Sequence, residues 1–325
     1  MVKDRIKGSV FGAVIGDSLG TLVEEMGEEE VKRSYGGAII GFLEPSPNSV
    51  CPYLKKGDFS HESQVFLTAL EVYGEKGYFD ENLYIEKLVE WVKDEKRHRY
   101  PSGAHINAAL SYAVGAEPEE ARVKASDIDG ALPATAAGLF RWDAPLEAYE
   151  EGKYIASLTH RDETLTDLAG VLAYSVSKVV GGGIVLNSLE EKLSFVESLR
   201  EVSKSQQVKA YLDLVIGALR KGISEKEAPL LIGNGSFAPE AFSTALFIFL
   251  KNPNSFRKAL LLAVNSYGEF GGDTDAIAFI TGSLSGGFLG IEAVPKRWIE
   301  CLRERKAVEL TVERFLESAV GKEEQ

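Results

Sequence analysis

The residues with the clearest chemical potential are 271–275 (GGDTD), which directly precede an apolar helical stretch. Two glycines allow a turn with backbone angles that other residues avoid, and Asp273 or Thr274 can then cap the following helix. Asp273 and Asp275 can also converge on a hard divalent cation, because such a cation prefers oxygen ligands. These residues therefore predict either a helix cap or a metal site.

A second polar run, residues 57–63 (GDFSHES), also stands just before a helical pattern. Ser60 is suited to cap that helix, and Glu62 would complement the positive end of its dipole. In the alternative interpretation, Ser60, His61 and Glu62 supply oxygen and nitrogen ligands to a cation. The residue types alone leave both interpretations open.

Weaker features lie elsewhere in the chain. Glu24 follows residues 16–20 (GDSLG) and is either solvated surface charge or a further acid of a site. His160 precedes another helix, where a single histidine is more often a cap or a core residue than a ligand. Residues 233–236 (GNGS) form a turn-rich loop that allows close approach of a ligand. The sequence contains no P-loop, no GxSxG and no HExxH, so three common classes of catalytic motif are excluded.

Helices must position these residues, because apolar side chains recur along most of the chain with helical period. We therefore expect an all-α protein with at least ten helices around one core. Alternating strand patterns are scarce, and residues 38–42 are either a short strand or an apolar loop. We expect a single domain over residues 1–325, with a frayed tail at about 320–325.

Two of the expected helices carry small residues at every fourth position. The positions are Gly8, Gly12, Gly16 and Gly20 in the first and Ala278, Gly282, Gly286 and Gly290 in the second. Glycine costs about 1 kcal/mol in a helix relative to alanine, so four in one stripe need a reason. A face without side chains lets two helix backbones approach closely, and we expect the two helices to be neighbours. The alternative is a series of short helices with glycine caps.

Composition narrows the class of protein further. The net charge of −13 argues against binding a nucleic-acid backbone. Cys51 and Cys301 form no CxxC pair, which disfavours a zinc finger or a redox motif. Residues 276–291, the most apolar stretch, are fewer than the roughly 20 that span a bilayer. No apolar targeting segment follows the first residues, so we expect a cytoplasmic protein.

Taken in chain order, several segments together resemble the ADP-ribosylglycohydrolase family. The segments are residues 8–20 (GSVFGAVIGDSLG), 56–63 (KGDFSHES), 157–160 (SLTH), 271–275 and 286–298. The resemblance implies an orthogonal multi-helix bundle. It also implies hydrolysis of the glycosidic bond at the anomeric carbon of ADP-ribose, with the help of magnesium ions.

The resemblance also implies roles for individual residues. The catalytic residues are expected to be Glu24, Glu62 and Asp273. The metal ligands are expected to be Ser60, His61, Glu62, Asp273 and Asp275. The substrate-binding residues are expected to be Asp17, Gly130, His160, Gly233, Gly235 and Ser236.

This sequence departs from the family pattern at the metal ligands and in one loop. His61 and Glu62 stand where aspartates are expected, and Ala276 stands where a threonine ligand is usual. Residues 129–138 (DGALPATAAG) lack a Met-Arg pair that the family carries. We therefore expect at most one bound Mg²⁺, and an imidazole ligand would shift preference toward Mn²⁺ or another divalent cation.

Two hypotheses about function follow from this mixture. In the first, the protein is a metal-assisted hydrolase of an N- or O-glycosidic ribosyl or ADP-ribosyl linkage, acting on a small molecule or an ADP-ribosylated substrate. In the second, it is a non-catalytic member of the family that binds a nucleotide-like ligand or has a structural role. The retained acids Glu62, Asp273 and Asp275 favour the first, and the departures favour the second. The sequence makes no prediction of the oligomeric state.

Overall fold

The computed structural model describes residues 1–95, 98–100 and 102–321. These residues form seventeen α-helices and a few 3₁₀ turns, with no β-strand among them, which confirms the expected all-α class. The α-helices are α1 (Val2–Gly20), α2 (Glu28–Tyr35), α3 (His61–Lys76), α4 (Glu81–Lys93), α5 (Gly103–Ala113), α6 (Pro118–Ala121), α7 (Thr135–Phe140), α8 (Pro145–Ser157), α9 (Glu163–Val180), α10 (Leu189–Val202), α11 (Gln206–Lys221), α12 (Ala228–Leu231), α13 (Ala238–Lys251), α14 (Phe256–Val264), α15 (Thr274–Leu289), α16 (Lys296–Cys301) and α17 (Arg305–Val320). The 3₁₀ turns are η2 (Ile128–Gly130), η3 (Leu132–Ala134) and η4 (Ile291–Ala293).

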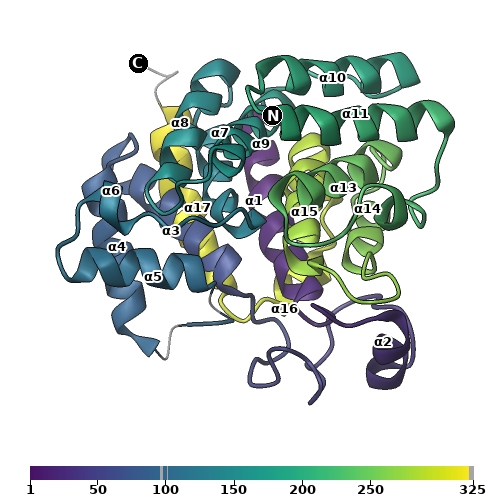
Figure 1. Ribbon diagram of the computed structural model, residues 1–325, viewed down its shortest axis with the longest axis horizontal. Coiled ribbons are helices and arrows are strands. Elements are labelled where there is room, and N and C mark those ends of the chain that lie inside the picture. The colour runs from purple at the N-terminus through teal and green to yellow at the C-terminus, as the bar shows by residue number, and fades with distance from the viewer. Residues whose placement is uncertain (96–97, 101, 322–325) are drawn as a thin grey trace.

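Two helices from opposite ends of the chain, α1 and α15, lie side by side at the centre of the molecule (Figure 1). A methyl group added to Gly12 would collide with the carbonyl oxygen of Gly282, and one added to Gly282 would collide with that of Gly12. Gly8 and Gly286 face each other in the same way. The two glycine stripes therefore form one close helix–helix contact, as the sequence predicts.

Each of the two helices is continuous through its stripe, which rules out a series of short helices with glycine caps. Gly290 differs from the other positions of the stripe because it follows the last helical residue and has a φ of 83°. It therefore ends α15, whereas Gly282 and Gly286 serve its packing.

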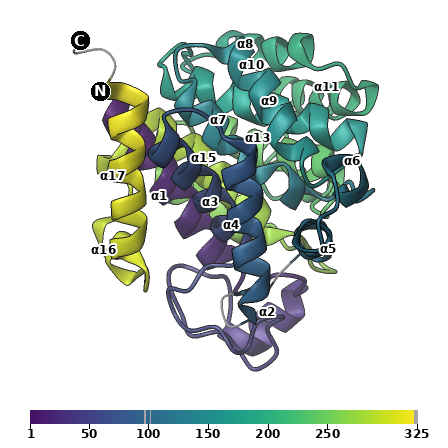
Figure 2. The same cartoon turned by 90° about the vertical axis from the view of Figure 1, so that its left-hand side faces the viewer.

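The other helices surround the central pair. α3 packs against α1 and α17, while α9 contacts α8, α7, α13 and α15. The antiparallel pair α10 and α11 lies at the opposite end of the molecule from α2 (Figure 2). The buried apolar side chains of these helices form one continuous cluster, which fixes the direction of every helix that enters the candidate site.

The structure also bears on three smaller predictions, which concern residues 38–42, the C-terminal tail and a membrane span. Residues 38–42 are irregular, so the loop interpretation is correct and the strand interpretation is wrong. Val320 is the buried last residue of α17, so fraying does not begin there, and residues 322–325 of the expected frayed tail lie outside the described residues. Among the described helices, none combines the length and apolar character that a bilayer crossing requires.

Candidate active site

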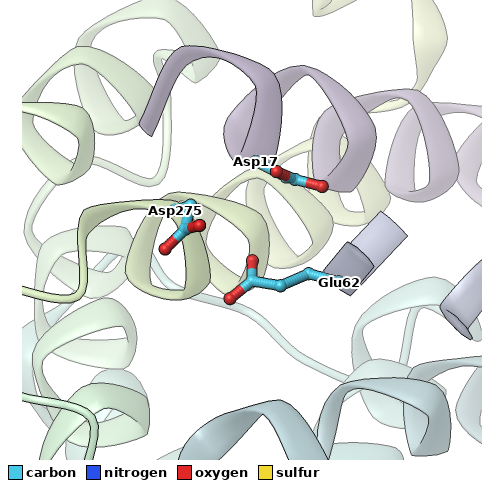
Figure 3. Close-up of side chains that lie close together, drawn as sticks. All are labelled: Asp17, Glu62 and Asp275. Carbon is cyan, nitrogen blue, oxygen red and sulfur yellow. The ribbon is translucent and has the colours of Figure 1, made fainter. Parts of the chain in front are cut away.

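The candidate site lies where the C-terminal end of α1 meets the N-terminal ends of α3 and α15. Figure 3 shows the carboxyl groups of Asp17, Glu62 and Asp275, one from each of these three helices. Residues that are far apart in the sequence are brought together because the glycine contact fixes α15 against α1. The distant Glu62 and Asp273 line the same cavity as a result.

Asp17 holds the N-terminal end of α3 in place. Its fully buried carboxylate accepts hydrogen bonds from the backbone N–H of Ser60, at 2.9 and 3.1 Å, and of Ser63, at 3.0 Å. The hydroxyl of Thr21 donates a further bond at 3.0 Å. Ser60 itself caps α3, since its hydroxyl accepts from the Glu62 N–H at 3.1 Å. Asp17, expected to bind substrate, is therefore engaged in anchoring the helix that carries Glu62.

The N-terminal end of α15 is held in a similar way. A carboxylate oxygen of Glu24 accepts from the Thr274 N–H at 2.8 Å, and the hydroxyl of Thr274 donates to the Gly20 carbonyl at 2.9 Å. Asp273 caps the helix by accepting from the Ala276 N–H at 3.3 Å. Asp273 therefore caps α15, as the sequence predicts. Asp273 and Asp275 consequently lie at the same end of this helix.

The carboxyl groups converge in two sets that share Asp275. Ligand atoms of Asp17, Glu62 and Asp275 lie within 4.8 Å of one another, and so do those of Glu24, Asp273 and Asp275. All five side chains are buried. Such crowding of like charges requires a compensating cation or shared protons.

The pKa values of these groups reflect the crowding. Burial, followed by the neighbouring Asp275 charge, raises the pKa of Glu24, Glu62 and Asp273 well above the usual range. Burial and the charge of Asp17 raise the pKa of Asp275 to about 6. In the absence of a cation, the site therefore holds protons at a pH where exposed carboxyl groups are ionised.

The residues present fit a hard divalent cation. Their donors are carboxylate oxygens, which such ions prefer. One oxygen of Glu62, Oε2, is buried without any hydrogen-bond partner, and a buried unpaired carboxylate oxygen is costly. A cation would satisfy this oxygen and reduce the repulsion among the acids.

A cavity of about 400 Å³ opens onto this cluster. Its lining includes Glu24, Glu62, Asp273 and Asp275 together with Tyr100, Asp127, Asp129 and Ser236. Cavities of similar volume elsewhere, such as the one beside Ser194 on α10, lack this group of convergent acids. The acid-lined cavity is therefore the place where a substrate would meet polarising groups.

His61 does not belong to either acid set. Its Nε2 lies 3.0 Å from Oδ2 of Asp129, and both residues line the same cavity as the acids. Burial acts to lower the pKa of His61, but the charge and hydrogen bond of Asp129, together with the charges of Asp275 and Asp17, outweigh burial and the pKa is raised. The His61 ring lies 6.0 Å from the ring of His105, which in turn lies 5.2 Å from the ring of His160.

Sequence reasoning missed Asp127 and Asp129, which line the cavity, and His105, whose buried ring lies next to those of His61 and His160. None of them belongs to a spaced motif, and α5 reads as an ordinary amphipathic helix. The one available signal was the scarcity of histidine, since the chain has only four. Burial lowers the pKa of His105 well below its usual value and that of His160 to about 4, so both rings are neutral at pH 7.

The expected substrate-binding residues lie in different surroundings. Gly130 packs against the His160 ring so closely that a Cβ would lie 2.7 Å from its Nδ1. The N–H of Gly235 donates to Glu240, and Gly233 has a φ of 104°. Ser236 lines the cavity, whereas His160 is not among its lining residues. Ser236 thus lines the same cavity as the acids. Gly130, Gly233 and Gly235 shape the loops around that cavity.

Sequence and structure comparisons place the chain among known proteins. The sequence profile of the family described as ADP-ribosylglycohydrolase matches residues 1–325. The chain is 27% identical over 318 residues to an uncharacterized protein of Archaeoglobus fulgidus, covering 95% of this chain and 94% of that one. It is 22% identical over 310 residues to an ADP-ribosylarginine hydrolase of Pseudomonas putida, covering 91% of this chain and 74% of that one.

Two further matches extend the comparison. An ADP-ribosylhydrolase of Bos taurus is 23% identical over 328 residues, covering 90% of this chain and 87% of that one. A solved structure described as an ADP-ribosylglycohydrolase-related protein complex superposes with a TM-score of 0.76 at 20% identity, covering 98% of this chain and 99% of that one. This likeness confirms the expected multi-helix bundle.

Proposed function

Because this chain belongs to the ADP-ribosylglycohydrolase family, we propose that it hydrolyses an N- or O-glycosidic bond of a ribosyl or ADP-ribosyl group. The observation that supports the proposal is the convergence of Glu24, Glu62, Asp273 and Asp275 on one cavity. Glycoside hydrolysis passes through an oxocarbenium-like state and uses carboxyl groups to move protons. The cavity supplies such groups in buried, firmly held positions.

The acid cluster would hold a divalent cation through Glu24, Asp273 and Asp275, with Glu62 close by. When bound, such an ion polarises substrate oxygens and lowers the pKa of nearby water. We propose Mg²⁺, with at most one ion held tightly, because Ala276 offers no hydroxyl and His61 is directed to Asp129. Mn²⁺ is the alternative ion.

Glu62 is the candidate general base. Its Oε2 has no hydrogen-bond partner, while burial and the Asp275 charge raise its pKa. A bound cation would keep the carboxyl group ionised, and the group could then accept a proton from an attacking water molecule. Asp17 keeps the first turn of α3, and hence Glu62, at a fixed place. We therefore assign the proton transfer to Glu62 and the positioning of Glu62 to Asp17.

The altered loop suggests where the substrate preference differs. Ala131, Leu132 and Ala134, within residues 129–138, are completely buried in the core, so this segment offers the cavity little besides Asp129. Two of the relatives named above are described as an ADP-ribosylarginine hydrolase and an ADP-ribosylhydrolase. We propose an ADP-ribosylated or small ribosyl compound as substrate for this chain.

The experiment that tests the function is the release of ADP-ribose from ADP-ribosyl-arginine and ADP-ribosyl-serine peptides in Mg²⁺, followed by chromatography. We expect turnover, and a loss of at least about 100-fold in kcat for Glu62→Gln. Asp162→Asn is the matched control, since Asp162 caps α9 away from the cavity and asparagine caps equally well. Unchanged turnover in Glu62→Gln would contradict the assigned role.

The alternative is a non-catalytic binder, which the position of His61 and the missing hydroxyl at Ala276 favour. The same preparation distinguishes the two functions. Tight binding of ADP-ribose by calorimetry, without release of ADP-ribose from any peptide tested, would establish the binder and reject the hydrolase.

A further inference from the structure

Two residues at the acid-lined cavity have a backbone conformation that residues with side chains rarely adopt. Glu25 has a φ of 60° and Tyr100 a φ of 48°, and they are the only non-glycine residues with a positive φ among those that the structure describes. Both of them line the cavity of the candidate active site. Such a conformation is unfavourable and persists only where the surrounding structure holds it. Its restriction to this one cavity calls for an explanation at the cavity.

Local contacts hold both residues in this conformation. The N–H of Glu25 donates to the carbonyl of Gly272 at 3.1 Å, and a Cβ at Gly271 would lie only 2.4 Å from the carbonyl oxygen of Glu25. The hydroxyl of Tyr53 accepts a hydrogen bond from the N–H of Tyr100 at 3.0 Å. Glu25 is therefore fixed against the loop that precedes α15, and Tyr100 is fixed against a second loop.

The side chains at the two positions are a carboxylate and an aromatic ring. The Glu25 side chain is exposed, whereas Tyr100 is partly buried and its ring is tilted by 76° to the His61 ring, with ring centres 6.5 Å apart. Burial, followed by the charges of Glu24, Asp275 and Glu25, raises the pKa of the Tyr100 phenol. The phenol is therefore a neutral group beside these acids.

The charge of the cavity favours a positively charged ligand. Seven carboxyl groups line it, and no lysine or arginine is among the described residues of the lining. A Mg²⁺ ion at Glu24, Asp273 and Asp275 would offset the inner acids, but Glu25 belongs to neither acid set, so its charge remains. A planar cation can bond to a carboxylate and stack on an aromatic ring, and this cavity offers both.

We propose that Glu25 and Tyr100 are specificity-determining residues that contact the leaving group and favour a planar cation, such as a guanidinium, over a neutral group. The inference rests on the proposed hydrolase function and deepens it by naming the class of leaving group. The strained backbone holds the two side chains in place before the substrate arrives, so binding does not have to order them. The proton transfer stays assigned to Glu62.

The test compares kcat/KM for an ADP-ribosyl-arginine peptide with that for an ADP-ribosyl-serine peptide, in Mg²⁺. We expect the unmodified chain to favour the arginine linkage. Glu25→Gln keeps the side-chain length and removes the charge, and it should lower the ratio of the two values at least about fivefold. Glu29→Gln is the matched control, because Glu29 is exposed on α2 outside the cavity lining and its loss changes the net charge equally. It should leave the ratio unchanged.

Two changes at Tyr100 separate recognition from strain. Tyr100→Ala removes the ring and keeps the strain, whereas Tyr100→Gly removes both, because glycine adopts a positive φ readily. Both changes should lower the ratio at least about fivefold, since the stacking surface is lost. The Tm of Tyr100→Gly should exceed that of Tyr100→Ala. A glycine variant that is more stable and less selective cannot owe its loss of selectivity to misfolding.

Two results would overturn the assignment. One is a ratio that stays the same in Glu25→Gln and Tyr100→Gly, in which case the positive φ values only serve the path of the chain. The other is hydrolysis of both peptides without preference by the unmodified chain, which would reject the pair and leave the hydrolase function standing.

The failure of the hydrolase function itself gives a different result. If the unmodified chain hydrolyses neither peptide, the same ratios are measured as Kd values of the intact peptides by calorimetry. A preference for the arginine-linked peptide that Glu25→Gln removes would then support the pair and reject only the hydrolase. Equal Kd values for the two peptides would overturn the pair as well.

Discussion

At the scale of single residues, the two neighbouring carboxyl groups of Asp17 and Glu62 have different roles. Asp17 accepts three hydrogen bonds from α3 residues and from Thr21, so its charge is stabilised without a cation. One carboxylate oxygen of Glu62 has no hydrogen-bond partner, so the ionised form of Glu62 requires a cation. The difference arises from backbone N–H groups, which point at Asp17 because it lies beneath the open end of a helix.

The first prediction concerns Asp17 as a positioning residue. Asp17→Ala leaves the buried N–H groups of Ser60 and Ser63 unpaired, so we expect a loss of about 1–3 kcal/mol in the free energy of unfolding. Because α3 also positions Glu62, Mg²⁺ affinity should fall as well. Urea unfolding and calorimetry measure the two effects. Asp162→Ala removes a cap of α9 and should lower stability while leaving Mg²⁺ affinity unchanged.

The second prediction concerns pH. The raised pKa values of Glu24, Glu62 and Asp273, and of Asp275 at about 6, mean that the folded state binds more protons than the unfolded state. Without metal, this part of the stability is therefore lost as pH rises above about 4, and for Asp275 the loss is complete above about pH 6. Mg²⁺ competes with these protons, so its stabilising effect should grow with pH.

The measurement is the rise in Tm caused by Mg²⁺ relative to a chelator, at two pH values on either side of 6. We expect a larger rise at the higher pH, and a smaller difference between the two in Glu62→Gln. Equal rises at both pH values would show that the acids are ionised throughout and that the assigned pKa shifts are wrong.

The third prediction concerns the metal count at the acid cluster. The double change His61→Asp with Ala276→Thr adds one carboxylate and one hydroxyl oxygen at the positions where the family pattern has them. We expect the Mg²⁺ stoichiometry measured by calorimetry to increase, because Mg²⁺ needs near-octahedral oxygen coordination. Two tightly bound Mg²⁺ ions in the unmodified protein would contradict this prediction.

At the scale of elements, the pair α1 and α15 determines the site. Glycines on both faces allow the backbones to touch, and Ser9 and Ser283 add a buried hydroxyl contact of 2.8 Å. The same contact brings Glu24, in the turn that follows α1, and Asp275, in the first turn of α15, to one end of the pair. The close contact is thus a condition for the acid cluster, because a wider spacing would separate the carboxyl groups.

The fourth prediction tests this contact. Gly12→Ala places a methyl group against the Gly282 carbonyl, backbone against backbone, so we expect a loss of about 3 kcal/mol or more in unfolding free energy. Gly217→Ala is the matched control in the interior of α11, where a Cβ would meet no atom within 4 Å. It should stabilise by up to about 1 kcal/mol. Similar effects of both changes in urea unfolding would show that the contact tolerates separation.

At the scale of the whole molecule, segments from near both ends of the chain pack together. α1 begins at Val2 and packs against α15, and α17 lies at one edge of the molecule against α3 and α1 (Figures 1 and 2). A core that needs both ends cannot form from either half alone. The expectation of a single domain over residues 1–325 therefore remains a prediction with a physical basis.

The fifth prediction follows from this arrangement. Thermal unfolding should show one transition, with the same midpoint by far-ultraviolet circular dichroism and by tryptophan fluorescence. Mg²⁺ should shift the whole transition, because the proposed ligands Glu24, Asp273 and Asp275 come from segments near the two ends of the chain. Two transitions, only one of which responds to Mg²⁺, would contradict a single cooperative unit.

Local chemistry made several features predictable from the sequence. Helical periodicity determines the all-α class, because an apolar stripe at that period can be buried only by a helix. The glycine stripes predicted the contact of α1 with α15, and Ser60 and Asp273 were recognisable as caps from their types and places. The acids before two helices pointed to one site, because helix ends are where backbone groups seek polar partners.

Only the tertiary structure decided which neighbour each polar side chain meets. His61 could contact any of several acids that line the cavity, and the position of Asp129 on η2 decided which one it meets. Asp17 anchors α3 because that helix begins directly above it, and its expected contact with substrate stays a prediction. His105, Asp127 and Asp129 had no motif to mark them. Their roles arise from contacts between distant segments, and a short-range pattern does not encode the distance between two elements that the chain brings together only on folding.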